Sequence, residues 1–229
     1  NAGTNKLDIV ELNNQIFELK SKVDKLILFL HGGIEHYKYP TIRQKKKYRC
    51  LIDLGVDCII GSHSHCFQGF EKYNKGIIFY SLGNLYFNDR GFPDAKISLG
   101  VKLLIGKNTN IDFEMIFLSN SFKNQKLSLL DKNEQFKKME NINEISQNIL
   151  SDNYLKKSYY NHSTKSLNKT IGLFIPLNKY VLALIKRTNM FKFFVSDTRF
   201  LSFLNTIHNE TARTILSKNL IRLYKKYYL

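Results

Sequence analysis

Residues 58–66 read CIIGSHSHC, an apolar run that breaks at a glycine and is followed by two histidines. The β-branched and apolar residues 56–60 predict a buried strand, which we expect to end at Gly61. His63 and His65 then lie on the loop beyond the strand, at the sheet edge where α/β proteins keep their chemistry. Two imidazoles so close in sequence can bind one metal ion from a single loop. The alternative is a pair of loop histidines that hydrogen-bond to the backbone.

A second stretch repeats this arrangement. Residues 25–30, KLILFL, predict another buried strand, and His31 with two glycines follows it. Between the strands, residues 40–54 predict a helix with a proline at its start and a glycine after its end. A strand, a helix and a strand form a βαβ unit, whose right-handed crossover places both strand ends at one edge of the sheet. We therefore predict that His31, His63 and His65 converge there.

The flanking segments predict further layers of an α/β domain. Residues 7–24 predict a helix that covers the sheet, because apolar side chains recur at helical spacing. The stripe comprises Leu12, Ile16, Phe17, Leu19 and Val23. Residues 68–76 are polar and predict a turn, and residues 77–80 predict a strand. Residues 97–105 and 111–118 predict a β-hairpin that closes the sheet.

The composition changes after residue 118. Residues 119–169 are polar and rich in lysine, with a predicted helix at 135–150 and a predicted loop at 159–163. Residues 170–229 carry apolar residues at helical spacing. We therefore predict three regions: an α/β domain over 1–118, a polar helical linker over 119–169 and a small helical region over 170–229.

The formal net charge of +16 bears on the class of partner. Only seven of the 35 basic residues are arginine, the residue of bidentate phosphate and base recognition. We therefore attribute most of the charge to composition and expect no specific binding of nucleic acid. The alternative is an anionic partner, whether a polymer, nucleic acid or a membrane surface. Three cysteines without a CxxC pattern predict no disulfide framework.

Five blocks of the sequence together resemble a known family. They are HGGIE at 31–35, Pro40, LIDLGVD at 51–57, GSHSH at 61–65 and YSLGN at 80–84. In order and spacing they resemble the poly-gamma-glutamate capsule-synthesis (CapA-like) family, a branch of the calcineurin-like metallophosphoesterases. The resemblance implies an α/β fold that is the C-terminal part of a four-layer α/β/β/α metallophosphoesterase-like sandwich, followed by a helical region. It also implies a two-metal site at the sheet edge.

The resemblance further implies roles for individual residues. His31, His63 and His65 correspond to histidine ligands of divalent metal ions (Mn, Zn or Fe), of which a complete family member holds two. Glu35 would be a catalytic proton shuttle or an orienting residue, with a surface glutamate as the alternative. Asn84 would contact the substrate, with a turn residue that bonds its own backbone as the alternative.

The sequence departs from the family's pattern at two positions. Gly32 stands where the family often has a tryptophan, and Ser62 stands where it often has a further histidine. The first departure resembles a variant form with paired glycines. The second is expected to remove a polar group beside the metal while leaving the pair of His63 and His65 intact.

The activity implied by the resemblance is metal-dependent hydrolysis, of the phosphohydrolase type, in capsule or poly-gamma-glutamate biosynthesis. The partner would be an anionic polymer or a phosphoester substrate. Calcineurin-like sites also need ligands from GDxxD-type and GNHD-type blocks, and none precedes His31. The alternative is therefore a non-catalytic scaffold or an anionic-polymer-binding module on a degenerate or split fold, which an upstream polypeptide would complete. Membrane association stays open, as does the compartment, the cytoplasm or the bacterial cell envelope.

Overall fold

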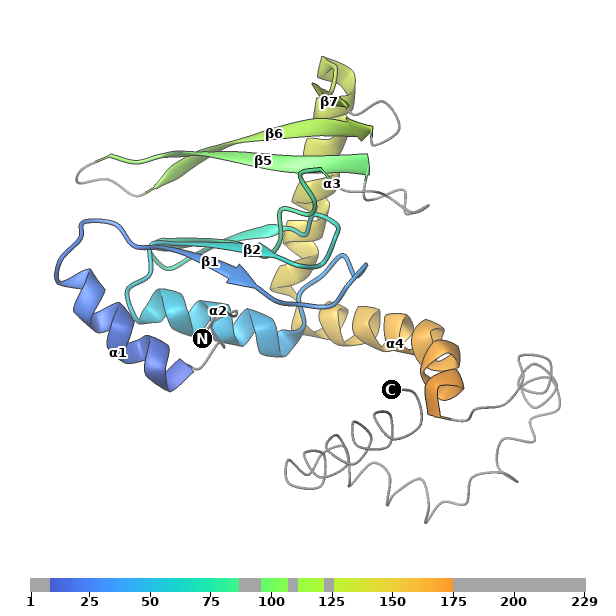
Figure 1. The fold of residues 1–229 in the computed structure, drawn as a ribbon, viewed down its shortest axis with the longest axis horizontal. Coiled ribbons are helices and arrows are strands. Elements are labelled where there is room, and N and C mark those ends of the chain that lie inside the picture. Colours follow the sequence, from blue (N-terminus) through green and yellow to red (C-terminus); the bar gives the residue numbers. More distant parts are fainter. Residues whose placement is uncertain (1–8, 87–95, 107–110, 122–125, 175–229) are drawn as a thin grey trace, which may run out of the picture. The chain divides into compact units, whose positions relative to one another are not determined.

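The computed structural model describes residues 9–86, 96–106, 111–121 and 126–174 (Figure 1). These residues form two β-sheets flanked by helices. The first sheet has four strands in the order β1-β2-β4-β3, and the second has three in the order β5-β6-β7. The predicted α/β fold class is confirmed. Within the described part, no helix is both long and apolar enough to cross a membrane.

The first sheet is built around a βαβ unit. Strands β1 (Ile27–His31) and β2 (Cys58–Ser62) are parallel neighbours, and helix α2 (Ile42–Asp53) connects them. Thr41 caps the first turn of α2 through its side-chain oxygen. Gly55 follows the helix with a φ of +111°, a backbone conformation that favours glycine. The predicted unit is confirmed, and both strands end at the same edge of the sheet.

Two further strands complete the first sheet. Strand β3 (Phe70–Tyr73) leads through a turn at Asn74 into strand β4 (Gly76–Phe79), and the two pair antiparallel. Strand β4 is in turn parallel to β2. The predicted turn over residues 68–76 was therefore wrong. The sequence does not show the apolar pattern of a buried strand over β3, because its buried position holds the ion-paired Glu71 in place of an apolar side chain.

Gly61 lies inside β2, which continues to Ser62, so the prediction that the strand ends at Gly61 was wrong. A Cβ atom at this position would lie 2.1 Å from the carbonyl oxygen of Tyr80, directly after the neighbouring strand β4. The glycine is therefore required by the close approach of another backbone segment. Any larger residue would push β2 and the segment after β4 apart.

The second sheet consists of β5 (Ile97–Leu104), β6 (Asp112–Ser121) and β7 (Lys126–Leu129), all antiparallel. The predicted β-hairpin is present as β5 and β6. The prediction that this hairpin closes the first sheet was wrong, because β5 and β6 belong to a separate sheet. Aromatic packing between the layers explains this arrangement, because the buried Phe117 ring of β6 meets the Phe67 ring at 5.6 Å between centroids.

The elements stack in layers (Figure 1). Helices α1 (Ile9–Lys20) and α2 lie on one side of the first sheet, and the second sheet lies on the other. Helix α3 (Lys132–Leu150) runs past both sheets and contacts β3 and β6. The main hydrophobic core fills the space between these layers. Its fully buried members include Leu51, Ile59, Ile78, Phe117 and Ile149.

Helix α1 covers less of the core than its sequence predicts. Ile16 is buried and Leu12 is half-buried, but Phe17 is 82% exposed. Leu19 and Val23 are exposed as well, so the prediction of a broad apolar stripe was wrong for these three positions.

Helix α4 (Asp152–Phe174) follows α3 and contains the predicted loop at 159–163, which was therefore wrong. Its weak apolar periodicity explains the error, because its tyrosines at these positions are exposed. The chain divides into two compact units, Asn1–Lys165 and Ser166–Leu229. Strand β7, helix α3 and the first part of α4 belong to the first unit. Most of the predicted helical region 170–229 lies outside the described residues.

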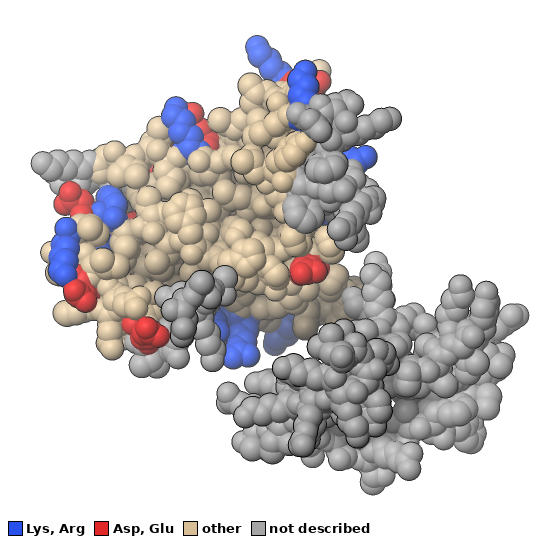
Figure 2. Space-filling model, viewed as in Figure 1, with Lys and Arg blue, Asp and Glu red and all other residues tan. Residues whose placement is uncertain are grey.

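Charged side chains of both signs lie on one face of the described residues. On the face drawn in Figure 2, Lys and Arg lie mostly near the margin, beside Asp and Glu, and the centre of that face carries neither kind. Two exposed ion pairs illustrate this mixing of signs, Lys22 with Glu18 and Lys102 with Glu114. Such a distribution agrees with the interpretation of the net charge as dispersed lysine.

Candidate functional site

The structure brings the three predicted histidines together at the end of the βαβ unit. His31 is the last residue of β1, and His63 and His65 lie on the loop after β2. The His63 Nδ1 atom lies 3.0 Å from His31 Nε2. The ring centroids of His31 and His63 are 4.7 Å apart, and those of His63 and His65 are 6.0 Å apart. The predicted convergence is confirmed, while the role of the histidines as metal ligands stays a prediction.

The backbone of this cluster is strained. The φ angles of His63 and His65 are +105° and +57°, and that of the neighbouring His36 is +56°. A non-glycine residue in this region costs on the order of 1–3 kcal/mol and persists only where the surroundings impose it. Three of the four such residues in the described part of the chain are thus histidines of one cluster. Strain concentrated in this way is typical of functional sites.

Two neighbouring side chains fix the orientation of the rings. Asn84 Oδ1 accepts a hydrogen bond from His65 Nδ1 at 2.9 Å, and Asn84 Nδ2 donates to the His65 carbonyl oxygen at 3.5 Å. Because an amide oxygen only accepts, His65 Nδ1 carries the proton and His65 Nε2 keeps its lone pair. This is the tautomer that a metal ligand requires. Asn84 therefore positions His65, and its substrate contact stays a prediction.

Ser62 orients the His31 ring as Asn84 orients the His65 ring. The Ser62 hydroxyl lies 3.1 Å from His31 Nδ1 and donates to the Leu30 carbonyl oxygen at 3.4 Å. With its proton directed at that carbonyl, the hydroxyl oxygen accepts from His31 Nδ1, so the lone pair of His31 lies on Nε2. The expectation that Ser62 removes a polar group from the site was therefore wrong. The serine hydroxyl itself supplies that group.

His63 Nδ1 donates a hydrogen bond to His31 Nε2, and a divalent ion could bind between the two nitrogens by replacing that proton. Nitrogen ligands at about 2.0–2.1 Å from a tetrahedral Zn²⁺ lie roughly 3.3 Å apart, and the two ring nitrogens here are 3.0 Å apart. His65 is the nearest candidate for a third ligand. Within the described residues, however, no group of three or more His, Cys, Asp or Glu side chains is arranged to hold a metal ion. The residues fit the start of a metal site without completing it.

Glu35 and Cys66 lie apart from this centre. Glu35 is exposed on the loop between β1 and α2, and among the described residues it makes no hydrogen bond to the histidines. Its predicted role as a proton shuttle therefore stays a prediction. Cys66 follows His65 directly but is buried, with its Sγ atom 3.5 Å from the Tyr37 carbonyl oxygen. All three cysteines are free thiols, as the sequence predicts.

His36 also belongs to the histidine cluster, although it was not predicted as a site residue. Its ring stacks on His65 with 5.6 Å between centroids, and its backbone N–H donates to the Ser64 carbonyl oxygen at 2.8 Å. The signal available in the sequence was a second histidine five residues after His31 in the same loop. The contact itself depends on how two loops meet, which no local pattern shows.

Two cavities border the cluster. One of about 420 Å³ adjoins His31 and opens between the two sheets. Its apolar walls include Phe29, Leu30, Leu82, Leu85 and Leu99. The other, of about 410 Å³, adjoins His36 and lies between residues 36–39 and helix α4. The histidine cluster is thus bordered by an apolar space on one side and an aromatic, basic space on the other.

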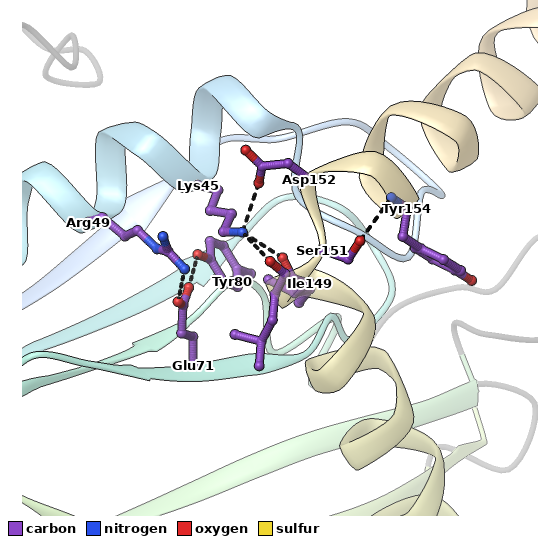
Figure 3. Close-up of polar contacts among 9 residues, drawn as sticks. Lys45, Arg49, Glu71, Tyr80, Ile149, Ser151, Asp152 and Tyr154 are labelled. Atoms are coloured by element: carbon purple, nitrogen blue, oxygen red, sulfur yellow. Dashed lines mark hydrogen bonds and ion pairs between the residues drawn. The ribbon is translucent and has the colours of Figure 1, made fainter.

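A second polar cluster lies on α2, with the buried side chains of Lys45 and Glu71 at its centre (Figure 3). The Lys45 side chain is 4% exposed, and its Nζ atom donates to the carbonyl oxygens of Ile149 (2.8 Å) and Leu150 (3.2 Å). These oxygens end helix α3, where carbonyls lack helical partners and a positive charge is favourable. Lys45 also pairs with Asp152 at 2.9 Å and lowers the pKa of that carboxyl. One lysine therefore joins α2 to the junction of α3 and α4.

The same face of α2 carries Arg49, which pairs with Glu71 of β3 (Figure 3). The Tyr80 hydroxyl donates to the other carboxylate oxygen of Glu71 at 2.7 Å. Burial raises the pKa of Tyr80, and the charge of Glu71 raises it further, so the hydroxyl remains a donor. The Glu71 side chain is 2% exposed, and its contacts link α2 to the first sheet. We assign this cluster to stability.

Comparison with known proteins adds to this geometry. Residues 1–89 match the family described as "Bacterial capsule synthesis protein PGA_cap". Residues 1–89 are thus similar to this CapA-like family. The CapA-like segment comprises the βαβ unit, β3 and β4, and all five predicted site residues lie in it. Helix α3, helix α4 and the second sheet lie beyond the matched range.

Two curated relatives carry related names. The chain is 34% identical over 122 residues to "Capsule biosynthesis protein CapA" of Bacillus anthracis, which covers 52% of this chain and 29% of that protein. It is 37% identical over 100 residues to "PGA biosynthesis protein CapA" of Bacillus subtilis (strain 168), which covers 44% of this chain and 26% of that protein. The alignments thus span less than a third of the length of these relatives.

Proposed function

We propose that this chain carries the histidine-rich part of a metal-dependent hydrolase-type site that serves capsule biosynthesis. The observation that carries the proposal is the convergence of His31, His63 and His65, with Ser62 and Asn84 directing two of the rings. The relatives are named as a capsule and a PGA biosynthesis protein, which supports a capsule polymer as the substrate, and the resemblance to metallophosphoesterases supports a phosphoester.

The chain's own residues would divide the work as follows. His31 and His63 would offer ring nitrogens to one ion, and His65 would approach from the same loop. Asn84 would hold His65 in the tautomer with its proton on Nδ1 and its lone pair on Nε2. Bound divalent ions would supply Lewis-acid stabilisation and a water with a lowered pKa. Glu35, on the adjoining exposed loop, is the nearest carboxylate in sequence to act as a proton shuttle.

A two-metal site also needs anionic ligands to hold two dications together. Among the described residues, no three His, Cys, Asp or Glu side chains are arranged to hold a metal ion. We therefore expect the 229-residue chain to retain at most one ion, of the Zn²⁺ type, and to show no hydrolase activity alone. The missing ligands would come from an upstream segment or a second polypeptide.

The test is to purify the chain, measure bound metal, and assay a generic phosphodiester with Mn²⁺ or Zn²⁺. We expect one weakly held ion in the wild type and none in His63→Ala, with His162→Ala in α4 as the control that keeps it. Equal metal retention in the wild type and His63→Ala would refute the metal site. Two tightly held ions with turnover that depends on His63 would show that this chain completes the site by itself.

A second candidate function is a non-catalytic module that binds an anionic polymer. The observation that favours it is the incomplete metal centre beside a basic and aromatic cavity. The two candidates differ in one measurement. A module of this kind would bind polymer equally well with and without EDTA and would support no turnover when a polypeptide that carries the missing ligands is supplied. Turnover on addition of that polypeptide would favour the enzyme.

A further inference from the structure

The cavity beside His36 has a wall that the histidine cluster does not use. Its volume is about 410 Å³, within the range of small-ligand sites, about 300–1,000 Å³. Residues 36–39 form one side, and the middle of helix α4 forms the other. The α4 side comprises Tyr154, Lys157, Ser158, Asn161 and His162. Helix α4 lies outside the segment that matches the family, so nothing assigns a role to this wall.

The lining of the cavity is suited to an anion. It contains two ammonium groups, on Lys38 and Lys157, together with hydroxyl, amide and imidazole groups, and no carboxylate. The two lysines come from different elements, so they face a ligand from two sides. No arginine is present among the lining residues, so the cavity offers separate ammonium groups and no bidentate guanidinium for either a phosphate or a carboxylate. Separate ammonium groups suit carboxylates that are spaced along a chain.

The aromatic side chains give the cavity hydroxyl donors and apolar surface. The hydroxyls of Tyr39 and Tyr154 are 3.1 Å apart and bond to each other, so the pair can present one proton to a ligand oxygen. Burial raises the pKa of Tyr39 to about 12, and the bond to Tyr154 adds to the rise, so the Tyr39 hydroxyl stays protonated at neutral pH. The Tyr37 hydroxyl is buried and has no hydrogen-bond partner of ordinary geometry among the described residues.

The cavity is continuous with the histidine cluster. His36 lines the cavity and at the same time stacks on His65, with 5.6 Å between the ring centroids. On the other wall, the His162 ring packs on Tyr37 at 4.6 Å between centroids. A ligand that occupies the cavity therefore lies next to the loop that would hold the metal ion.

We propose that this tyrosine–lysine cavity binds carboxylate groups of an acidic oligomer and holds that oligomer against the histidine cluster. Lys38 and Lys157 pair with the carboxylates, the Tyr39 and Tyr154 pair donates a hydrogen bond, and the aromatic rings pack on the methylene groups between them. The choice of oligomer rests on the proposed function, which names a capsule polymer as substrate. The cavity itself rests on the contacts above.

The test is calorimetric titration of the 229-residue chain, in EDTA, with a short γ-linked glutamate oligomer. A γ-linked glutamine oligomer of the same length is the neutral probe, and inorganic phosphate is the competing anion. We expect the acidic oligomer to bind, the neutral one to bind at least about tenfold more weakly, and added salt to weaken the binding. Tighter binding of inorganic phosphate than of the oligomer would overturn the assignment to carboxylates.

Variants locate the site. The double variant Lys38→Glu/Lys157→Glu reverses two exposed charges, so the fold should persist while oligomer affinity falls by about tenfold or more. Lys137→Glu makes the same kind of change on an exposed position of α3 and should alter affinity by less than about twofold. Tyr154→Phe removes one hydroxyl and should cost about threefold to tenfold. Equal affinity in the double variant and in Lys137→Glu would overturn the proposal.

A last variant separates this proposal from the metal site. His63→Ala should lose metal retention but bind the oligomer in EDTA within about twofold of the wild type, because His63 does not line the cavity. Loss of oligomer binding in His63→Ala would show that the histidine cluster, and not the cavity, holds the polymer. Absence of oligomer binding by the wild type at millimolar concentration would refute the cavity while leaving the metal proposal standing.

Discussion

The histidine cluster stands on strained backbone at the end of two strands and is half open to solvent, whereas the cluster on α2 stands on a regular helix and has the buried side chains of Lys45 and Glu71 at its centre. In the α2 cluster every charge has an opposite charge or a helix end beside it. In the histidine cluster, hydrogen bonds hold the ring nitrogens that face away from the centre and leave others directed at it. The two clusters thus use similar polar groups in opposite ways.

The fold places its stabilising polar contacts and its candidate ligand-binding groups in different clusters. Buried charges are tolerated when they are paired, and removing one partner leaves the other without compensation in a low-dielectric site. Strained residues are tolerated when the surrounding structure holds them, and they concentrate where a ligand is to be bound. We therefore expect mutations in the α2 cluster to change stability, and mutations in the histidine cluster to change ligand binding.

The largest expected effect is that of Glu71→Ala. This change leaves the Arg49 guanidinium and the Tyr80 hydroxyl without their acceptor, so we expect a loss of about 3–5 kcal/mol in the free energy of unfolding. Urea denaturation followed by circular dichroism would measure it. Glu114→Ala removes an exposed partner of Lys102 and should cost less than about 1 kcal/mol. Equal losses of unfolding free energy in both variants would show that the α2 cluster contributes no more to stability than an exposed ion pair.

Asn84→Ala tests the ligand-binding side. The variant loses the acceptor that fixes His65 Nδ1 as a donor, so we expect metal affinity to fall by about 10–100-fold with little change in unfolding. Competition with a chromophoric chelator would measure the affinity. Asn84→Asp keeps an acceptor at the same place and should recover most of the loss. If Asn84→Ala lowered the unfolding free energy by several kcal/mol and left metal affinity intact, Asn84 would belong with the stabilising residues.

The sequence predicts one cluster better than the other for a physical reason. The convergence of His31, His63 and His65 follows from strand patterns and the handedness of a βαβ unit, which are general rules. The α2 cluster needs strand β3, and β3 was missed because its buried position holds Glu71. The role of Gly61 likewise depends on the approach of the Tyr80 carbonyl, a tertiary contact. Local pattern therefore gave the topology and the histidines but not the buried ion pairs.

Tertiary contacts at the histidine cluster and the cavity were likewise not predictable from local sequence patterns. His36 stacks on His65 only because two loops with positive φ angles meet, and no periodicity predicts that contact. Helix α4, which forms one wall of the tyrosine–lysine cavity, was predicted as a loop over 159–163 because it lacks a clear apolar stripe. Chemistry carried by residues after a strand could thus be predicted, whereas chemistry carried by surfaces that pack together could not.

A smaller effect of the opposite sign is expected for His63→Gly. Glycine adopts a φ of +105° without strain, so the variant should be more stable by about 1 kcal/mol, although it loses the metal contact. Asn74→Gly, at the turn between β3 and β4 with a φ of +50°, is the matched control and should gain stability without any change in metal binding. A destabilised His63→Gly would show that the imidazole supports the fold. The assignment of the histidine cluster to ligand binding rather than stability would then be wrong.

The smallest effect concerns thiol reactivity, and it tests whether the loop of the histidine cluster is as well held as the α2 cluster. Cys50 lies exposed on α2, Cys58 is buried in β2, and Cys66 is buried directly after His65. Burial raises the pKa of the Cys58 thiol to about 12, and the charge of Asp57 adds to the rise, so the reactive thiolate is scarce in the folded state at pH 8. We expect Ellman's reagent to modify one thiol quickly in the native chain and three in urea, and Cys50→Ser to remove the fast phase. Fast modification of Cys66 in the Cys50→Ser variant would mean that the loop opens on the timescale of the reaction, and the strained geometry of His63 and His65 would then be one conformation among several.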